Sequence, residues 1–99
     1  MLQVLIIDDE PSVVKSLYRS IDWGALGLEV AGIAANGEEG LTIAEKKRID
    51  IAICDIRMPG ISGLEVCERL QNMFQNIQLI IISGYAEFAY AERAIRVGV

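Results

Sequence analysis

The 99-residue chain is 53% hydrophobic and carries a net charge of −5, a composition that argues against a disordered segment. Its Lys and Arg residues are scattered, so it lacks the basic stripe that contact with a nucleic-acid backbone requires. The absence of histidine excludes Ser-His-Asp and Cys-His catalysis, and no apolar run is long enough to span a membrane. The N-terminus lacks the features of a signal peptide, so we expect a cytoplasmic protein.

Strands and helices are predicted to alternate from the first residues onward. The segment LQVLIID is apolar on both strand faces, which is typical of a parallel sheet covered by helices. A helix follows over DDEPSVVKSLYRSI, with Pro11 near its start. The longer connection after it contains Trp23, which we expect to anchor this crossover against the sheet.

The alternation continues to the end of the chain. A strand over EVAGIAA precedes the helix GEEGLTIAEKKR, which Asn36 and Glu39 are predicted to cap. IDIAIC is the third predicted strand, Ser62 and Glu65 cap the third helix, IQLIIIS is the fourth strand, and AEFAYAERAIRVG is the fourth helix. This pattern predicts a single α/β domain over residues 1–99, with a doubly wound parallel sheet and right-handed crossovers.

The two cysteines fall inside predicted elements. Cys54 lies in the third strand and Cys67 on the inward face of the third helix, and no CxxC motif or histidine accompanies them. A zinc site is therefore not expected, and both are interpreted as reduced core residues.

Polar side chains follow three of the predicted strands. Asp8 and Asp9 follow the first strand, Asp55 the third, and Ser83 ends the fourth. With a strand order of 2-1-3-4, the first and third strands are neighbours about 4.8 Å apart, so these side chains converge at the carboxyl edge of the sheet. Carboxylates 4 Å apart repel by about 1 to 4 kcal/mol per pair, which predicts a cation among them. Oxygen ligands suit Mg²⁺, and the set suggests phosphoryl transfer with an aspartate nucleophile.

A structural interpretation of the same acids stays open. A single aspartate at a strand end is more often a helix cap, and Asp8 to Glu10 before Pro11 would suit the start of a helix. Three acids and a hydroxyl at one sheet edge are hard to explain by capping alone.

Three motifs, in this order and at this spacing, carry a family resemblance over essentially the whole chain. They are VLIIDDE, DIRMPGISGLE and LIIISGY. The chain resembles the receiver domain of two-component response regulators. The stretches IDWGALGLEVAGIAANGEEGL and SGYAEFAYAERAIRVGV are most similar to receivers joined to an AraC-type helix-turn-helix output domain.

The resemblance implies a role for each residue of the predicted site. Asp55 matches the phospho-acceptor, which takes its phosphoryl group from a phosphohistidine of a sensor histidine kinase. Asp9 matches a direct Mg²⁺ ligand and Asp8 a ligand acting through water, while Asp55 and the backbone carbonyl of Arg57 complete the protein's share of the coordination. Ser83 matches the hydroxyl that contacts the phosphoryl group and transmits the switch.

Two further positions, Arg57 and Tyr85, match variable positions that tune the lifetime of the acyl phosphate. DNA binding and transcriptional control would need a C-terminal domain that this chain does not contain, and no membrane partner is implied. The implied fold is flavodoxin-like (CheY-like), with strand order 2-1-3-4-(5).

The sequence departs from the family pattern at its end. The fifth strand, with its lysine, and the fifth helix are absent, and no lysine follows Lys47. We therefore expect a fragment of a longer chain. If the chain is whole, the apolar fourth strand becomes a sheet edge, which predicts a homodimer formed by edge pairing or strand exchange, or poor solubility.

Several functions stay open on the sequence alone. The leading hypothesis is a signalling switch that phosphorylates itself at Asp55 and is not a turnover enzyme. A degenerate receiver that acts as an interaction or dimerisation module is the alternative. A Mg²⁺-dependent phosphohydrolase would need a second acid where Arg57 stands, and a flavin-binding domain would need a phosphate loop in place of the acids after the first strand.

Overall fold

The computed structural model describes residues 1–56 and 60–82 of the chain. The strands in this part form a parallel sheet in the order β2-β1-β3-β4, as predicted. The strands are β1 (Leu2–Ile7), β2 (Leu28–Ala34), β3 (Ile51–Asp55) and β4 (Gln78–Ile82). β1 and β3 are therefore neighbours in the middle of the sheet, which brings their carboxyl ends together.

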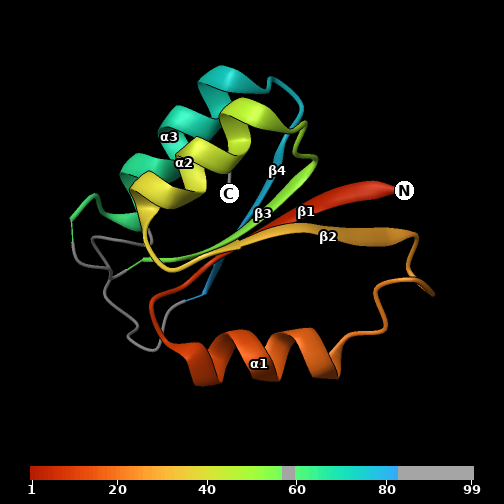
Figure 1. Ribbon diagram of the computed structural model, residues 1–99. Helices are drawn as coiled ribbons and strands as arrows, with labels where there is room; N and C mark the ends of the chain where they lie inside the picture. The colour runs from red at the N-terminus through yellow and green to blue at the C-terminus, as the bar shows by residue number, and fades with distance from the viewer. Residues whose placement is uncertain (57–59, 83–99) are drawn as a thin grey trace.

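Helices cover both faces of the sheet (Figure 1). α1 (Pro11–Ser20) lies on one face, and α2 (Gly37–Lys46) and α3 (Gly63–Met73) lie side by side on the other. This arrangement confirms the doubly wound architecture. The predicted fourth helix lies outside the described residues.

Two apolar layers follow from the alternation of side chains along β1. Val4 and Ile6 point towards α1, where they form a small buried cluster with Ile53. Leu5 and Ile7 point to the other face and belong to the larger cluster beneath α2 and α3. These four side chains are fully buried, as the apolar run of the strand predicts, whereas Leu2 at the start of β1 is exposed.

Trp23 anchors the first crossover, as predicted. Its ring packs against the small cluster on the α1 side of the sheet. The indole N–H donates to the carbonyl oxygen of Tyr18 at 3.1 Å, which links the end of α1 to the loop that follows it.

Both predicted caps are present at the starts of α2 and α3. The Asn36 side chain accepts a hydrogen bond from the Glu39 N–H at 2.8 Å, and the Ser62 hydroxyl accepts one from the Glu65 N–H at 3.3 Å. Each cap satisfies one of the free N–H groups of a first helical turn. α1 instead begins with Pro11 after Glu10, and the Glu10 side chain makes no capping hydrogen bond.

The third strand is shifted from its predicted range of Ile49 to Cys54. It spans Ile51–Asp55, although Ile49 is buried in the core. The Asp50 side chain, just before the strand, accepts a hydrogen bond from the Gln3 N–H at 2.7 Å instead of facing solvent. Asp55 is consequently the last residue of β3 and not the first residue after it.

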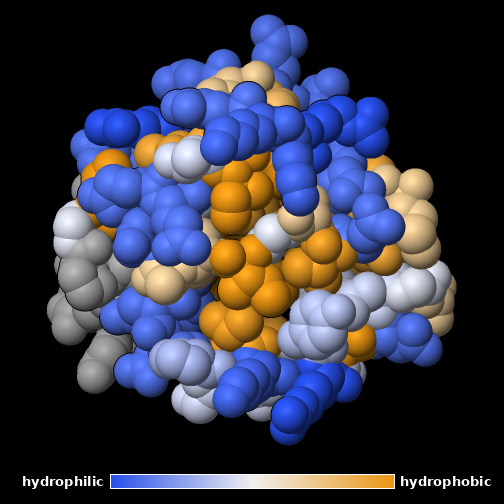
Figure 2. All heavy atoms as spheres, in the orientation of Figure 1, coloured by the Kyte–Doolittle hydropathy of each residue, from blue (hydrophilic) through white to orange (hydrophobic). Residues whose placement is uncertain are grey.

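The surface is hydrophilic over the helices and apolar in a central band (Figure 2). In that view the band lies between α1 and the α2–α3 layer, where the edge strand β2 runs. No helix within residues 1–56 and 60–82 has the length and hydropathy needed to cross a membrane.

Candidate functional site

Three carboxylates meet at the carboxyl edge of the sheet. One side-chain oxygen from each of Asp8, Asp9 and Asp55 can be chosen so that all three atoms lie within 4.8 Å of one another. Asp8 and Asp9 follow β1, and Asp55 ends β3. The last residue pair between these strands is Ile7 with Cys54, so the chain delivers Asp8 and Asp55 side by side one residue further on. The predicted convergence of the three acids is confirmed.

Asp8 is the buried member of the three, with 4% of its surface exposed. Its Oδ1 accepts a hydrogen bond from the Glu10 N–H at 2.9 Å, and its own N–H donates to the Ala34 carbonyl at 3.0 Å. The first bond fixes the turn into α1, so Asp8 has part of the structural role that the capping interpretation gave it. Asp9 is exposed and Asp55 is half-buried.

The backbone of Asp55 is held from the side of α3. The Gly63 N–H donates to the Ile56 carbonyl at 2.9 Å. A Cβ atom at Gly63 would overlap the carbonyl oxygen of Asp55, so only glycine permits this approach of helix and strand. We did not single out Gly63 from the sequence; the signal available was a glycine directly after the predicted cap, Ser62.

Gly60 lies between the end of β3 and the start of α3. Its φ of +82° lies in the left-handed region that favours glycine. Glu38, in the first turn of α2, lies against it, and a Cβ atom at Gly60 would come within 2.9 Å of the Glu38 Oε1. This contact between α2 and the turn after β3 depends on tertiary packing, and no sequence pattern indicated it.

Two thiols lie directly beneath the acids. Cys54 and Cys67 are both fully buried and free, as predicted. Interaction with the neighbouring Cys67 thiol, together with burial and the nearby carboxylates of Asp55 and Asp8, raises the pKa of Cys54 far above its usual range. The Cys54 thiol donates a hydrogen bond to the carbonyl oxygen of Asp55 at 3.4 Å.

The acid cluster fits a magnesium ion in the kind and spacing of its ligands. Mg²⁺ prefers oxygen ligands at about 2.1 Å, so two ligands on opposite sides of the ion lie about 4.2 Å apart. A set within 4.8 Å matches this geometry after a small adjustment, or with one acid binding through water. Without a cation, the three negative charges repel one another.

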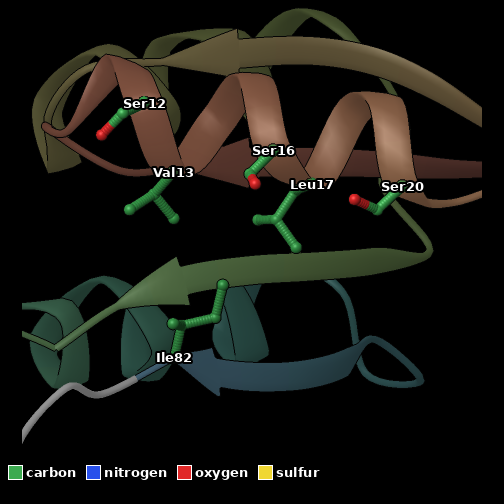
Figure 3. Close-up of a pocket in the computed structure, with 6 residues that line it drawn as sticks. All are labelled: Ser12, Val13, Ser16, Leu17, Ser20 and Ile82. Atoms are coloured by element: carbon green, nitrogen blue, oxygen red, sulfur yellow. The ribbon is translucent and has the colours of Figure 1, made fainter.

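A small cavity of about 280 Å³ adjoins the acids on the β2 side. Asp8, Asp9 and Glu39 are its acidic lining residues, Ile33 contributes apolar surface, and Lys15 of α1 lines it as well. This cavity provides solvent access to Asp8 and Asp9. A separate groove of about 510 Å³ lies between α1 and β4, where Val13 and Leu17 face Ile82 across the gap (Figure 3). That groove contains none of the three acids.

The remaining predicted site residues lie outside the described part of the chain. These are Arg57, whose backbone carbonyl was expected to bind the metal, Ser83, expected to contact the phosphoryl group, and Tyr85. Their assignments stay predictions.

Comparison with known proteins identifies a family for this arrangement. The response regulator receiver domain profile matches residues 4–99. The uncharacterized transcriptional regulatory protein YesN of Bacillus subtilis is 35% identical over 99 residues, which are the whole of this chain and 27% of that protein. The chain thus spans about a quarter of that relative's length.

Solved structures agree with the sequence match. The receiver domain of AraT, a response regulator from Geobacillus stearothermophilus, is similar with a TM-score of 0.92 and 39% identity, over 99% of this chain and 76% of that one. A two-component transcriptional regulator AraC from Clostridium phytofermentans is similar with a TM-score of 0.89 and 30% identity, over 97% and 74% of the two chains.

Proposed function

The chain belongs to the response regulator receiver domain family, and on that premise we propose that it accepts a phosphoryl group on Asp55 from a phosphohistidine of a sensor histidine kinase. The observation that carries this proposal is the convergence of the Asp8, Asp9 and Asp55 carboxylates. Asp55 sits at the tip of a central strand, with its backbone held against α3, and is therefore presented in a fixed position.

The transfer exchanges one bond of phosphorus for another. A carboxylate oxygen of Asp55 forms a P–O bond, the P–N bond of the phosphohistidine breaks, and the imidazole leaves with the electron pair and takes up a proton. Asp8, Asp9 and Asp55, with the backbone carbonyl of Arg57, are the proposed ligands of Mg²⁺, which would neutralise charge on the phosphoryl oxygens. Ser83 is the proposed contact of the bound phosphoryl group.

The acyl phosphate is proposed to act as a switch and not as an intermediate of a turnover enzyme. It adds a net charge of about −1, because the phosphoryl group replaces the charge of the carboxylate, and it brings new acceptor oxygens to a small site. Such a change biases an existing equilibrium between two conformations by a few kcal/mol.

The proposed partners follow from the relatives. YesN is named as a transcriptional regulatory protein, and this chain spans 27% of it, so transcriptional control through a DNA-binding domain beyond this chain fits. The other proposed partners are the sensor kinase and a second copy of this chain, and the proposed compartment is the cytoplasm.

Intact mass spectrometry tests the proposal. The protein is incubated with Mg²⁺ and phosphoramidate, and the expected product is heavier by about 80 Da, the mass of one phosphoryl group. Asp55→Asn should abolish the adduct. Asp50→Asn changes an acid of the same sheet in the same way and should retain it.

Two results would contradict the proposal. A wild-type protein that gains no mass under these conditions would favour a phosphorylation-independent interaction module. Continuous release of phosphate over many turnovers, with no adduct accumulating, would indicate a hydrolase.

A further inference from the structure

A pair of buried thiols joins the strand that bears Asp55 to the helix that follows it. Cys54 is the central-strand residue just before Asp55, paired with Ile7 on one side and Ile81 on the other. Cys67 is fully buried on the inward face of α3, and the two side chains belong to one core cluster. The proposed phosphorylation uses neither of them.

The geometry brings the two sulfur atoms together. Cys54 Sγ lies 3.9 Å from the carbonyl oxygen of Gly63. In an α-helix that carbonyl accepts from the N–H four residues later, which is that of Cys67, so the Cys54 sulfur lies beside the turn of α3 that ends at Cys67. Each thiol shifts the pKa of the other, as expected for neighbouring groups of one core cluster. A disulfide needs the two sulfurs to approach to about 2.05 Å, which requires a displacement of α3 relative to β3.

We propose that Cys54 and Cys67 form a reversible disulfide on exposure to a two-electron oxidant such as a peroxide, and that this crosslink slows phosphoryl acceptance at Asp55. The second half of this statement rests on the proposed function. The reaction breaks two S–H bonds and forms one S–S bond. Two protons and two electrons pass to the oxidant, and hydrogen peroxide is reduced to two molecules of water.

The crosslink reaches Asp55 through two contacts. The Cys54 thiol donates to the Asp55 carbonyl at 3.4 Å, and oxidation removes that donor. Drawing α3 towards β3 also presses Gly63 onto the same carbonyl, where no space is left even for a Cβ atom. The backbone that positions the Asp55 carboxylate must therefore shift.

Burial controls the rate of this reaction. Neither thiol is exposed, so oxidation follows a brief local opening of α3 from β3. Small oxidants should therefore react faster than bulky ones. Warming the protein to just below its unfolding midpoint increases the population of the open form. Oxidation then becomes fast enough to measure although both thiols are buried in the closed form.

Thiol counting tests the crosslink without reference to phosphorylation. The protein is treated at that temperature with hydrogen peroxide or diamide, denatured, alkylated with N-ethylmaleimide and weighed intact. We expect a loss of about 2 Da with no alkylation, reversed by dithiothreitol. Cys54→Ala and Cys67→Ala should not show that loss. Two alkylatable thiols in the treated wild type, or oxidation of one sulfur alone to a sulfenic or higher acid, would overturn the proposal.

A second measurement tests the link to Asp55. The rate of the 80 Da gain with phosphoramidate should fall by about tenfold in the disulfide form and recover with dithiothreitol. Oxidant should leave the rate of Cys67→Ala unchanged. Equal rates for the reduced and crosslinked wild type would overturn the link. A reduced protein that gains no phosphoryl group would contradict the proposed function instead, and the thiol count would still report the disulfide.

Discussion

Aspartates lie at both ends of the parallel sheet, and the two ends hold them in opposite ways. At the amino end, Asp50 accepts the Gln3 N–H at 2.7 Å and lies 3.3 Å from the guanidinium of Arg48. At the carboxyl end, Asp8, Asp9 and Asp55 lie within 4.8 Å of one another. The first arrangement supplies donors to a carboxylate, and the second concentrates negative charge. The contrast separates an acid that is paired with hydrogen-bond donors from acids that lie close to one another.

The largest expected effect comes from closing the space beside Asp55. Gly63→Ala places a methyl group on the Asp55 carbonyl, so helix and strand must separate. We expect a loss of about 3 kcal/mol in the free energy of unfolding, measured by urea denaturation. Gly24→Ala is the matched control, because nothing lies within 4 Å of its Cβ position. Equal effects of the two substitutions would contradict the tight contact.

Removing the acid at the amino end comes next. Asp50→Ala leaves the half-buried Gln3 N–H without its acceptor and should lower the free energy of unfolding by about 2 kcal/mol. Arg48→Ala removes the cation of the same pair, but this side chain is 71% exposed, so the expected loss is a few tenths, up to about 0.5 kcal/mol. Urea denaturation measures both. Similar losses for the two variants would show that the ion pair, and not the backbone hydrogen bond, gives Asp50 its role.

Removing an acid at the carboxyl end of the sheet should raise the free energy of unfolding instead of lowering it. Asp9→Asn removes one of three mutually repelling charges and should raise the free energy of unfolding by up to about 1 kcal/mol at low salt without Mg²⁺. Adding Mg²⁺ should stabilise the wild type and leave the variant nearly unchanged. Thermal unfolding with and without Mg²⁺ measures both effects. Glu45→Gln, an exposed acid on α2, is the control and should leave the Mg²⁺ response intact.

The smallest expected effect concerns the helix that follows Asp55. Ser62→Ala removes the 3.3 Å cap of the Glu65 N–H and should lower the free energy of unfolding by about 0.5 kcal/mol. Ser62→Asn retains a capping side chain and should restore most of the loss. Failure of the asparagine variant to do so would mean that the hydroxyl has a role other than capping.

The sequence was sufficient for the topology and for the positions of the acids. The buried run of β1, the two caps and the alternation of elements each depend on neighbouring residues, and together they predicted a doubly wound parallel sheet. The order β2-β1-β3-β4 was implied by the resemblance to receiver domains, and the structure confirms it. Because the carboxyl ends of adjacent parallel strands meet, the cluster of Asp8, Asp9 and Asp55 followed from that order.

Contacts between elements were beyond reach of the sequence pattern. Cys54 and Cys67 were each assigned correctly to the core, but their place in one core cluster depends on how α3 is rotated over β3. The position of Glu38 against Gly60 depends in the same way on where α2 sits. The start of β3 was misplaced because Asp50 engages the Gln3 backbone, and its residue type alone does not reveal such a partner.

The intrinsic fluorescence of Trp23 can report on the packing of one layer of the fold. It is the only tryptophan of the chain, and its ring packs on the α1 side of the sheet. The thiol pair lies in the opposite layer. Indole emission should therefore follow loosening of α1, while thiol reactivity follows loosening of α3. Measuring both signals during unfolding would show whether the helix layer on one side of the sheet separates before the layer on the other side.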